Sequence, residues 1–408
     1  MMFQKSSSTT SRVSILSLLA ALTVALSGCA GLQMGGDSQA TRAVSGDYAG
    51  NETVAVLLPQ SGRYADAAQI VRNGIVAAQA ADPQGKRPTL KFYDSAKGSI
   101  TDLVKQATAD GANVILGPLQ KRTVETLVNT SSPSVPVLTL NRASGERKPP
   151  NNIFQFSLAP EDEAASVANG AWSQGHRTAV MLYPEGHWGN RLSRAFRQEW
   201  RALGGKMAAT QSFDPAAGDF SQTVADLSER AAGADFVFLV ATAKLARQIW
   251  PQIRHKIGAD VPVYSTSNIY SGRFDPEGDR GLVGLNFVEI PWLLGATQGD
   301  SVSSKGLNGK LPRLYAMGVD AYRLGSRLEW MSANSQARVQ GKTGILSMDS
   351  QRRIHRQLTL ARIDASGPVK IAAIYTEDMG KTAGTIRLYS TGPRLASVGL
   401  SGLGTARQ

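Results

Sequence analysis

The feature that most constrains the fold of this chain is an alternation of short apolar runs with helical stretches, which begins at Glu52. The run "VAVLL" (residues 54–58) ends at Pro59 and a Ser-Gly pair, as a buried strand followed by a turn would. Apolar or small residues then recur at the spacing of one helical face, at positions 67, 70, 71, 74, 75 and 78. The runs "LKFYDS", "NVILGP", "VPVLTLN" and "NIFQFSL" follow as further strands, with helical stretches near 101–110 and 120–129. Such alternation predicts βαβ units and parallel sheets.

The same unit recurs in the second half of the chain, because "TAVMLYPEGHWGN" (178–190) parallels "VAVLLPQSGRYAD" (54–66). The sequence therefore predicts an α/β fold of two lobes, each a parallel sheet flanked by helices. "GLNFVEIPW" is expected to cross back, and "GILSMDSQRRIHRQLTLARI" to form two strands around a polar turn. The expected first lobe is about 52–158 plus about 290–330. The second is about 159–289 plus about 340–375, and residues 376–408 form a loose tail.

The N-terminus has the pattern of a bacterial lipoprotein signal. Lys5 and Arg12 precede an apolar run of signal-peptide length, and "LSGC" ends at Cys29, the single cysteine of the 408 residues. We expect a signal peptide over 1–28, lipidation of Cys29 and a flexible tether over 29–51. Ala30, which is not Asp, resembles the pattern of outer-membrane sorting. An ordinary signal peptide with a chance cysteine, or a short core helix, is the alternative.

The formal charge of +12 limits the class of partner. A basic exported protein could face anionic lipid, wall polymer or an acidic partner. We expect no nucleic acid, because no nucleic-acid-binding motif accompanies the charge. The basic residues are spread along the chain, so a merely solvated basic surface is the alternative interpretation.

Motifs of catalysis and cofactor binding are missing from the sequence. The histidines at 176, 187, 255 and 355 have no zinc-site spacing, and no nucleotide-binding glycine loop is present. Lys342-Thr343-Gly344 matches one box of penicillin-binding enzymes, but the Ser-x-x-Lys box that they also need is absent. We therefore expect no catalytic residues, no metal and no cofactor.

Polar and aromatic side chains follow several predicted strands, where open α/β sheets bind ligands. The candidates are Ser61, Arg63, Tyr64, Thr139, Asn141, Tyr183, His187, Trp188, Ser265 and Thr266. Facing one another across a cleft, they could hold a small polar ligand. The alternative is that the hydroxyl and amide residues are turn formers and helix caps, and that His187 and Trp188 form a hydrophobic plug.

The chain from about 52 to 363 resembles the C-terminal domain of the penicillin-binding protein activator lipoproteins. The matching stretches include "VAVLLPQSGRYADAAQIVRNGI", "ILGPLQKRTVETL", "FQFSLAPEDEA", "VPVYSTSNIYSG" and "RLYAMGVDAYRL". The resemblance implies a fold like that of type I periplasmic binding proteins. It also implies an outer-membrane lipoprotein that reaches through the peptidoglycan to stimulate a bifunctional penicillin-binding protein, as a regulator without chemistry of its own.

One departure from that family concerns the distance that the tether can span between the lipid anchor and the folded domain. Long members carry an N-terminal helical-repeat domain, whereas here about twenty tether residues lie between Cys29 and Glu52, and they stretch to about 70 Å at most. The alternative function is a solute-binding or sensing lipoprotein that closes on an amino acid or a muropeptide. A wall hydrolase is the third hypothesis.

Overall fold

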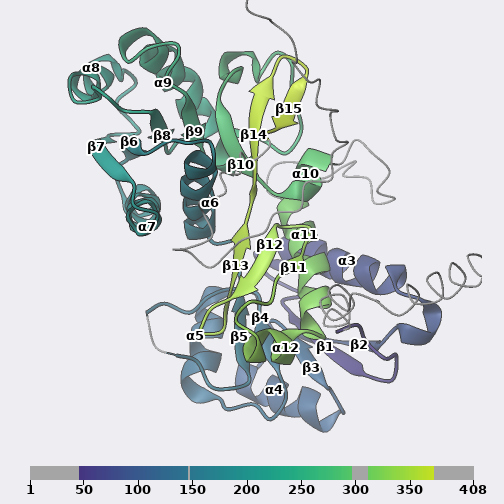
Figure 1. The fold of residues 1–408 in the computed structure, drawn as a ribbon. Coiled ribbons are helices and arrows are strands. Elements are labelled where there is room, and N and C mark those ends of the chain that lie inside the picture. The colour runs from purple at the N-terminus through teal and green to yellow at the C-terminus, as the bar shows by residue number, and fades with distance from the viewer. Residues whose placement is uncertain (1–45, 146–147, 296–310, 372–408) are drawn as a thin grey trace, which may run out of the picture. The chain divides into compact units, whose positions relative to one another are not determined.

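The computed structural model describes residues 46–145, 148–295 and 311–371, and Figure 1 shows their fold. The first lobe is built on an eight-stranded sheet with the order β11-β12-β13-β5-β4-β3-β1-β2. Its N-terminal elements are β1 (Thr53–Leu58), α3 (Ala65–Ala81), β2 (Thr89–Asp94), α4 (Ile100–Ala109), β3 (Val114–Leu116), α5 (Lys121–Thr130), β4 (Val137–Thr139) and β5 (Ile153–Phe156). Strands β1 to β5 pair in parallel, as the alternating pattern predicted.

The second lobe is built on a seven-stranded sheet with the order β15-β14-β10-β9-β8-β6-β7. Its elements are α6 (Pro160–Ser173), β6 (Thr178–Pro184), α7 (His187–Ala202), β7 (Lys206–Phe213), α8 (Ser221–Glu229), β8 (Phe236–Leu239), α9 (Ala243–Lys256), β9 (Val263–Ser265) and β10 (Asn286–Glu289). Alternate residues of the buried strands serve opposite faces. Met181 and Phe238 pack with α6 and α7, whereas Leu182 and Leu239 pack with α8 and α9.

The remaining elements return to both sheets. They are α10 (Pro291–Gly295), α11 (Leu311–Gly325), α12 (Leu328–Ala333), β11 (Val339–Gln340), β12 (Ile345–Met348), β13 (Arg353–Gln357), β14 (Thr359–Asp364) and β15 (Gly367–Lys370). Helix α11 packs against α3, and β13 pairs in parallel with β5, so these elements belong to the first lobe. Strand β14 pairs with β10 in the second sheet.

Two sequence expectations need correction here. Residues 340–357 belong to the first sheet and not to the second lobe, because β13 pairs with β5 before the chain crosses at Leu358. The sheets are mixed and not purely parallel: β12 is antiparallel to β11 and β13, and β14 to β10 and β15. The β11–β12, β12–β13 and β14–β15 connections are short, and only antiparallel neighbours can be joined in this way.

The expected tether ends earlier than residue 51. Tyr48 is buried, and the Glu52 carboxylate accepts hydrogen bonds from the backbone N–H groups of Ala49 and Gly50, both at 2.8 Å. The folded unit therefore includes residues 48–51. The expected signal peptide, Cys29 and the tail over 376–408 lie outside the described residues. Among the described helices, none has the length and apolarity needed to cross a membrane.

Candidate functional site

The loop between β1 and α3 carries three predicted ligand residues on the surface. Ser61, Arg63 and Tyr64 are all exposed. Arg63 donates a hydrogen bond to the Tyr64 hydroxyl, and its guanidinium carbon lies 4.5 Å from the Tyr64 ring centroid. This pair is open to solvent and presents an arginine and an aromatic ring, a combination that is enriched at binding interfaces.

The predicted residues at the end of β4, Thr139 within the strand and Asn141 just beyond it, form hydrogen bonds to the protein itself. Thr139 is fully buried, and its hydroxyl donates to the Asn141 carbonyl at 2.7 Å. The Asn141 side-chain amide donates to the Leu119 carbonyl at 3.1 Å, and its oxygen accepts from the Arg142 N–H. The contacts of the Thr139 hydroxyl and the Asn141 oxygen match the turn-forming alternative, because both bond to neighbouring backbone, while the Asn141 amide ties this turn to Leu119.

The predicted residues of the second lobe likewise include both buried and exposed side chains. Ser265 and Thr266 are fully buried, and the Ser265 hydroxyl donates to the Leu239 carbonyl at 2.7 Å. Tyr183 and Trp188 are half-buried and pack against the core, while His187 is exposed at the start of α7. The ligand role of the ten residues stays a prediction, and the geometry leaves Ser61, Arg63, Tyr64 and His187 as the ones with exposed side chains.

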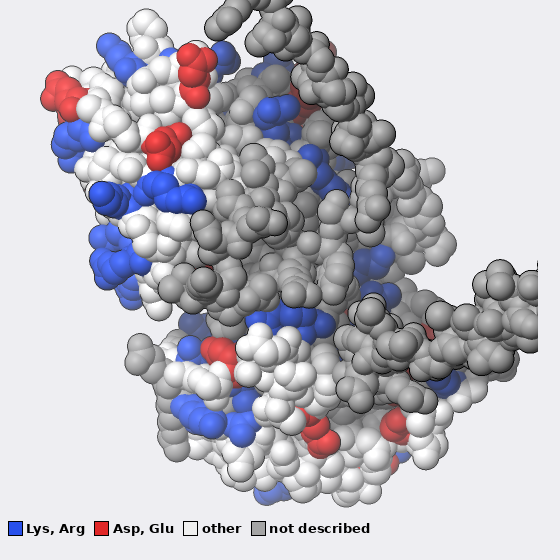
Figure 2. Space-filling view, in the orientation of Figure 1, with Lys and Arg blue, Asp and Glu red and all other residues white. Residues whose placement is uncertain are grey.

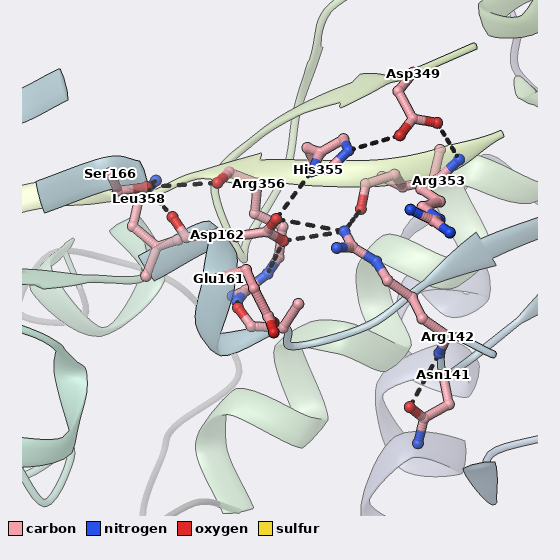
Figure 3. A network of polar contacts seen from close by, with 12 residues as sticks. Asn141, Arg142, Glu161, Asp162, Ser166, Asp349, Arg353, His355, Arg356 and Leu358 are labelled. Carbon is pink, nitrogen blue, oxygen red and sulfur yellow. Dashed lines mark hydrogen bonds and ion pairs between the residues drawn. The ribbon is translucent and has the colours of Figure 1, made fainter. Parts of the chain in front are cut away.

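A cluster of buried and partly buried charges that the sequence did not predict includes Arg142, the residue after Asn141. Figure 3 shows side chains converging on Asp162, in the first turn of α6. Its carboxylate lies 3.2 Å from Arg142 Nη2, 3.0 Å from His355 Nδ1 and 3.5 Å from Arg356 Nε. His355 Nε2 lies 3.0 Å from Asp349. We name Arg142, Asp162, Asp349, His355 and Arg356 the hinge cluster.

Electrostatics favour the charged forms of His355 and Asp162 in the hinge cluster. Burial opposes charge on His355, but the hydrogen bonds to Asp162 and Asp349 outweigh it and raise the pKa of His355 to about 9. Burial likewise opposes charge on Asp162, yet the nearby Arg142 and the hydrogen bond from His355 hold the pKa of Asp162 below its usual range. These groups bond to one another, which is the geometry of a structural network.

Lys342-Thr343-Gly344 has a structural explanation. The fully buried Asp320 accepts hydrogen bonds from the Lys342 N–H at 2.7 Å, the Thr343 N–H at 2.7 Å and the Thr343 hydroxyl at 2.6 Å. The tripeptide forms the turn between β11 and β12 around this carboxylate. Because Thr343 is fully buried, its hydroxyl is not accessible to a substrate.

Concave surface lies next to the β1–α3 loop and next to the hinge cluster. A pocket of about 330 Å³ between β1, α3 and β2 is lined by Val56, Leu58 and Phe92, with the Arg72 guanidinium 3.9 Å from the Phe92 ring centroid. A second pocket of about 180 Å³ borders Asp162, His355 and Arg356. Neither is lined by any of the ten predicted residues. No group of metal-binding side chains occurs in the described ranges.

The charge on the visible surface is dispersed. Figure 2 shows lysine and arginine side chains over both lobes, interspersed with acidic ones. That distribution matches the solvated basic surface considered as the alternative.

Comparisons with known proteins show which family this chain is similar to. Residues 48–365 match the family model described as "LppC putative lipoprotein". The penicillin-binding protein activator LpoA of Pantoea ananatis is 30% identical over 321 residues, which cover 69% of this chain and 47% of that protein. The LpoA of Serratia proteamaculans is 31% identical over 314 residues, 68% of this chain and 46% of that protein. The chain thus spans about half the length of the curated relatives it matches.

Solved structures agree on the fold. The C-domain of LpoA from Haemophilus influenzae, described as a regulator of PBP1A, superposes with a TM-score of 0.70 at 23% identity, covering 79% of this chain and 100% of that one. A protein of Chromobacterium violaceum described as "a putative branched-chain amino acid ABC transporter" reaches a TM-score of 0.64 at 28% identity, over 76% of this chain and 100% of that one. The predicted two-lobed class is therefore confirmed, with mixed sheets.

Proposed function

This chain belongs to the LppC lipoprotein family, and from that membership we propose that it binds a bifunctional penicillin-binding protein and stimulates peptidoglycan synthesis. One observation carries the proposal: its sequence match to relatives named penicillin-binding protein activators runs through the two-lobed domain. The activity of those relatives belongs to proteins about twice the matched length. Its transfer to this chain is therefore the step that needs testing.

The site geometry supports a regulator more than a catalyst. Thr139 and Ser265, the last residues of β4 and β9, and Asn141, just beyond β4, donate side-chain hydrogen bonds to backbone carbonyls. Asp162 and His355 are held by each other and by arginines, with no nucleophile in the cluster. A domain of this kind acts through the surface it presents, and the exposed Arg63 and Tyr64 are part of that surface.

The proposed location is the periplasmic face of the outer membrane. Cys29 would carry the lipid after removal of residues 1–28, and residues 30–47 would tether the folded domain. We propose peptidoglycan as a second partner, since a domain on this tether would lie against the wall.

Reconstitution tests the activator role. The mature chain with Cys29→Ser is mixed with a purified bifunctional penicillin-binding protein of the same bacterium, and glycan polymerisation from lipid-linked precursor is followed. We expect a higher rate and a saturable complex. A two-lobed solute-binding protein of similar size is the control for non-specific effects. An unchanged rate together with no complex would refute the proposal.

The lipid anchor has a separate test. Wild-type protein should incorporate a fatty-acid analogue and pellet with outer membranes. Cys29→Ser should remain unprocessed or soluble, because a serine hydroxyl lacks the nucleophilicity of a thiolate. A serine variant that still fractionates with outer membrane, or wild-type protein that takes no label, would show that Cys29 is not the anchor.

The alternative function is capture of a small solute. The likeness to the branched-chain amino acid transporter protein favours it. Thermal unfolding with amino acids and muropeptides separates the two, because a specific ligand at a hundredfold excess over Kd stabilises the fold by about 2.7 kcal/mol. Saturable stabilisation by one compound would favour the solute-binding function.

A further inference from the structure

The lobes are joined by chain segments that cross between the two sheets, and hinges of domain closure lie at segments of this kind. The structure describes two of them in full: residues 157–159, between β5 and α6, and Leu358, between β13 and β14. Figure 1 shows β13 and β14 end to end across the two sheets. Rotation of one lobe against the other requires the backbone torsions of such segments to change.

Buried side chains fasten both hinge segments. The Ser166 hydroxyl accepts a hydrogen bond from the Leu358 N–H at 3.0 Å and donates to the Asp162 carbonyl at 2.7 Å. Arg356 Nη2 donates to the Ala159 carbonyl at 3.1 Å. Each segment is thus held by a side chain from an element that adjoins the other segment. Ser166 lies on α6, which follows residues 157–159, and it holds Leu358. Arg356 lies on β13, which precedes Leu358, and it holds Ala159.

Asp162 and the three basic side chains around it come from different lobes. Asp162 belongs to the second lobe, whereas Arg142, His355 and Arg356, which surround it, belong to the first. Asp162 and Arg356 are 3% and 4% exposed, so water does not replace these contacts while the lobes stay in place.

A second set of contacts repeats this division. Arg313 on α11 of the first lobe pairs with the fully buried Glu289 at the end of β10 of the second, through Nε at 3.0 Å. Arg313 also donates to the Tyr270 carbonyl at 3.1 Å. Opening of the lobes would separate buried opposite charges at both places.

We propose that these ion pairs and hydrogen bonds clamp the hinge, so that the two lobes move as one body and the domain does not capture solutes by lobe closure. The same fold closes by bending at such crossing segments when it binds ligands. Here Leu358 is bonded to Ser166 of the second lobe, and Ala159 is bonded to Arg356, which also pairs with Asp162 across the lobes. The clamp concerns the hinge alone and does not depend on the identity of the partner.

An interlobe distance tests the clamp. In the mature Cys29→Ser chain, Lys105→Cys on α4 and Gln198→Cys on α7 place one spin label on each lobe, both at exposed positions. We expect one narrow distance distribution, unchanged by amino acids or muropeptides. Two interconverting distances, or a shift on adding any of these compounds, would overturn the proposal.

Clamp variants complete the test. Asp162→Asn and, separately, His355→Gln should broaden the distribution. Ser166→Ala should speed hydrogen exchange at the Leu358 amide by roughly fivefold to tenfold, the factor expected for one buried hydrogen bond. His355 is 42% exposed, so His355→Gln decides the outcome if Asp162→Asn lacks a folded melting transition.

The matched control is Arg191→Gln. It removes the Arg191–Glu161 pair, which joins α7 and α6 within the second lobe at 2.6 Å, beside the hinge cluster. The control should keep the narrow distribution. Clamp variants as narrow as wild type would show that these contacts do not hold the lobes.

Discussion

Tyr48 donates a hydrogen bond from its hydroxyl to the carbonyl of Tyr322, which lies 274 residues further along the chain, at 3.1 Å. The two rings lie 4.9 Å apart between centroids, and Tyr48 is 4% exposed. The Tyr322 hydroxyl in turn donates to Asp82 at 2.5 Å, beyond the end of α3. The segment before β1 is therefore part of the core, fixed where α11 meets α3.

Truncating this aromatic contact should destabilise the fold. Tyr48→Ala removes a buried ring and should cost about 3–5 kcal/mol of unfolding free energy. Tyr48→Phe keeps the ring and loses one hydrogen bond, so it should cost about 1 kcal/mol. Urea unfolding of the mature chain measures both. Tyr64→Ala is the control, because Tyr64 is 37% exposed and its loss should cost little. Equal midpoints for Tyr48→Ala and wild type would show that the domain starts later.

The hinge cluster predicts how stability depends on pH. The pKa of His355 is raised from 6.5 to about 9 in the fold, so its contribution is complete below about pH 6.5 and lost as the pH rises through 9. The pKa values of Asp162 and Asp349 are lowered from 3.8, so their contribution is lost as the pH falls below that value. Stability from the cluster should therefore be greatest between these limits.

The variant His355→Gln tests the predicted loss of stability at alkaline pH. Between pH 7 and pH 10 the melting temperature of the variant should fall less than that of wild type, because only wild type loses the imidazolium. Other alkaline titrations are common to both proteins and cancel in the difference. Parallel curves over that range would mean that His355 is not charged in the folded protein.

The parts of the fold with a strong local pattern could be predicted from sequence. β1 and β6 are apolar runs followed by proline and glycine, and both were recognised. β7 was not, because "KMAATQSF" mixes buried with exposed positions and has no clear period. The expectation that residues 340–357 belong to the second lobe is wrong, since sheet membership depends on the pairing of β13 with β5, which no local pattern encodes.

The same limit applies to the hinge cluster. Arg142 and His355 reach Asp162 from 20 and 193 residues away in sequence. Each looks alone like a surface charge, and only the crossing of the chain between the sheets brings them together. The strand-end residues were easier to locate, but whether Thr139 faces a cleft or its own backbone depends on contacts that a sequence pattern does not contain.

Asp320 should be a strong stability determinant. Asp320→Ala leaves the N–H groups of Lys342 and Thr343 and the Thr343 hydroxyl without their acceptor, at about 1–3 kcal/mol for each donor that stays buried. We expect a total loss of about 3–5 kcal/mol in urea unfolding. Asp102→Ala is the control and should change stability by less than about 0.5 kcal/mol, because Asp102 is 74% exposed. A small effect at Asp320 would mean that the turn between β11 and β12 is held in another way.

Two glycines allow α3 and α11 to approach closely, and alanine at either should be harmful. A Cβ at Gly74 would lie 2.2 Å from the Tyr315 carbonyl oxygen, and one at Gly318 would lie 2.1 Å from that of Val71. Alanine raises helix propensity by about 1 kcal/mol, but a clash with a rigid backbone forces the helices apart. We expect Gly74→Ala and Gly318→Ala each to cost about 2 kcal/mol net or more.

Gly170→Ala on α6 is the matched control, since the added Cβ would meet only the Leu360 side chain, at 3.4 Å. It should be neutral or stabilise the protein by up to about 1 kcal/mol, because the gain in helix propensity is not offset by a backbone clash. Chemical unfolding of the three variants gives the comparison directly. If all three shift stability in the same direction, backbone approach between α3 and α11 does not explain the glycines at these positions.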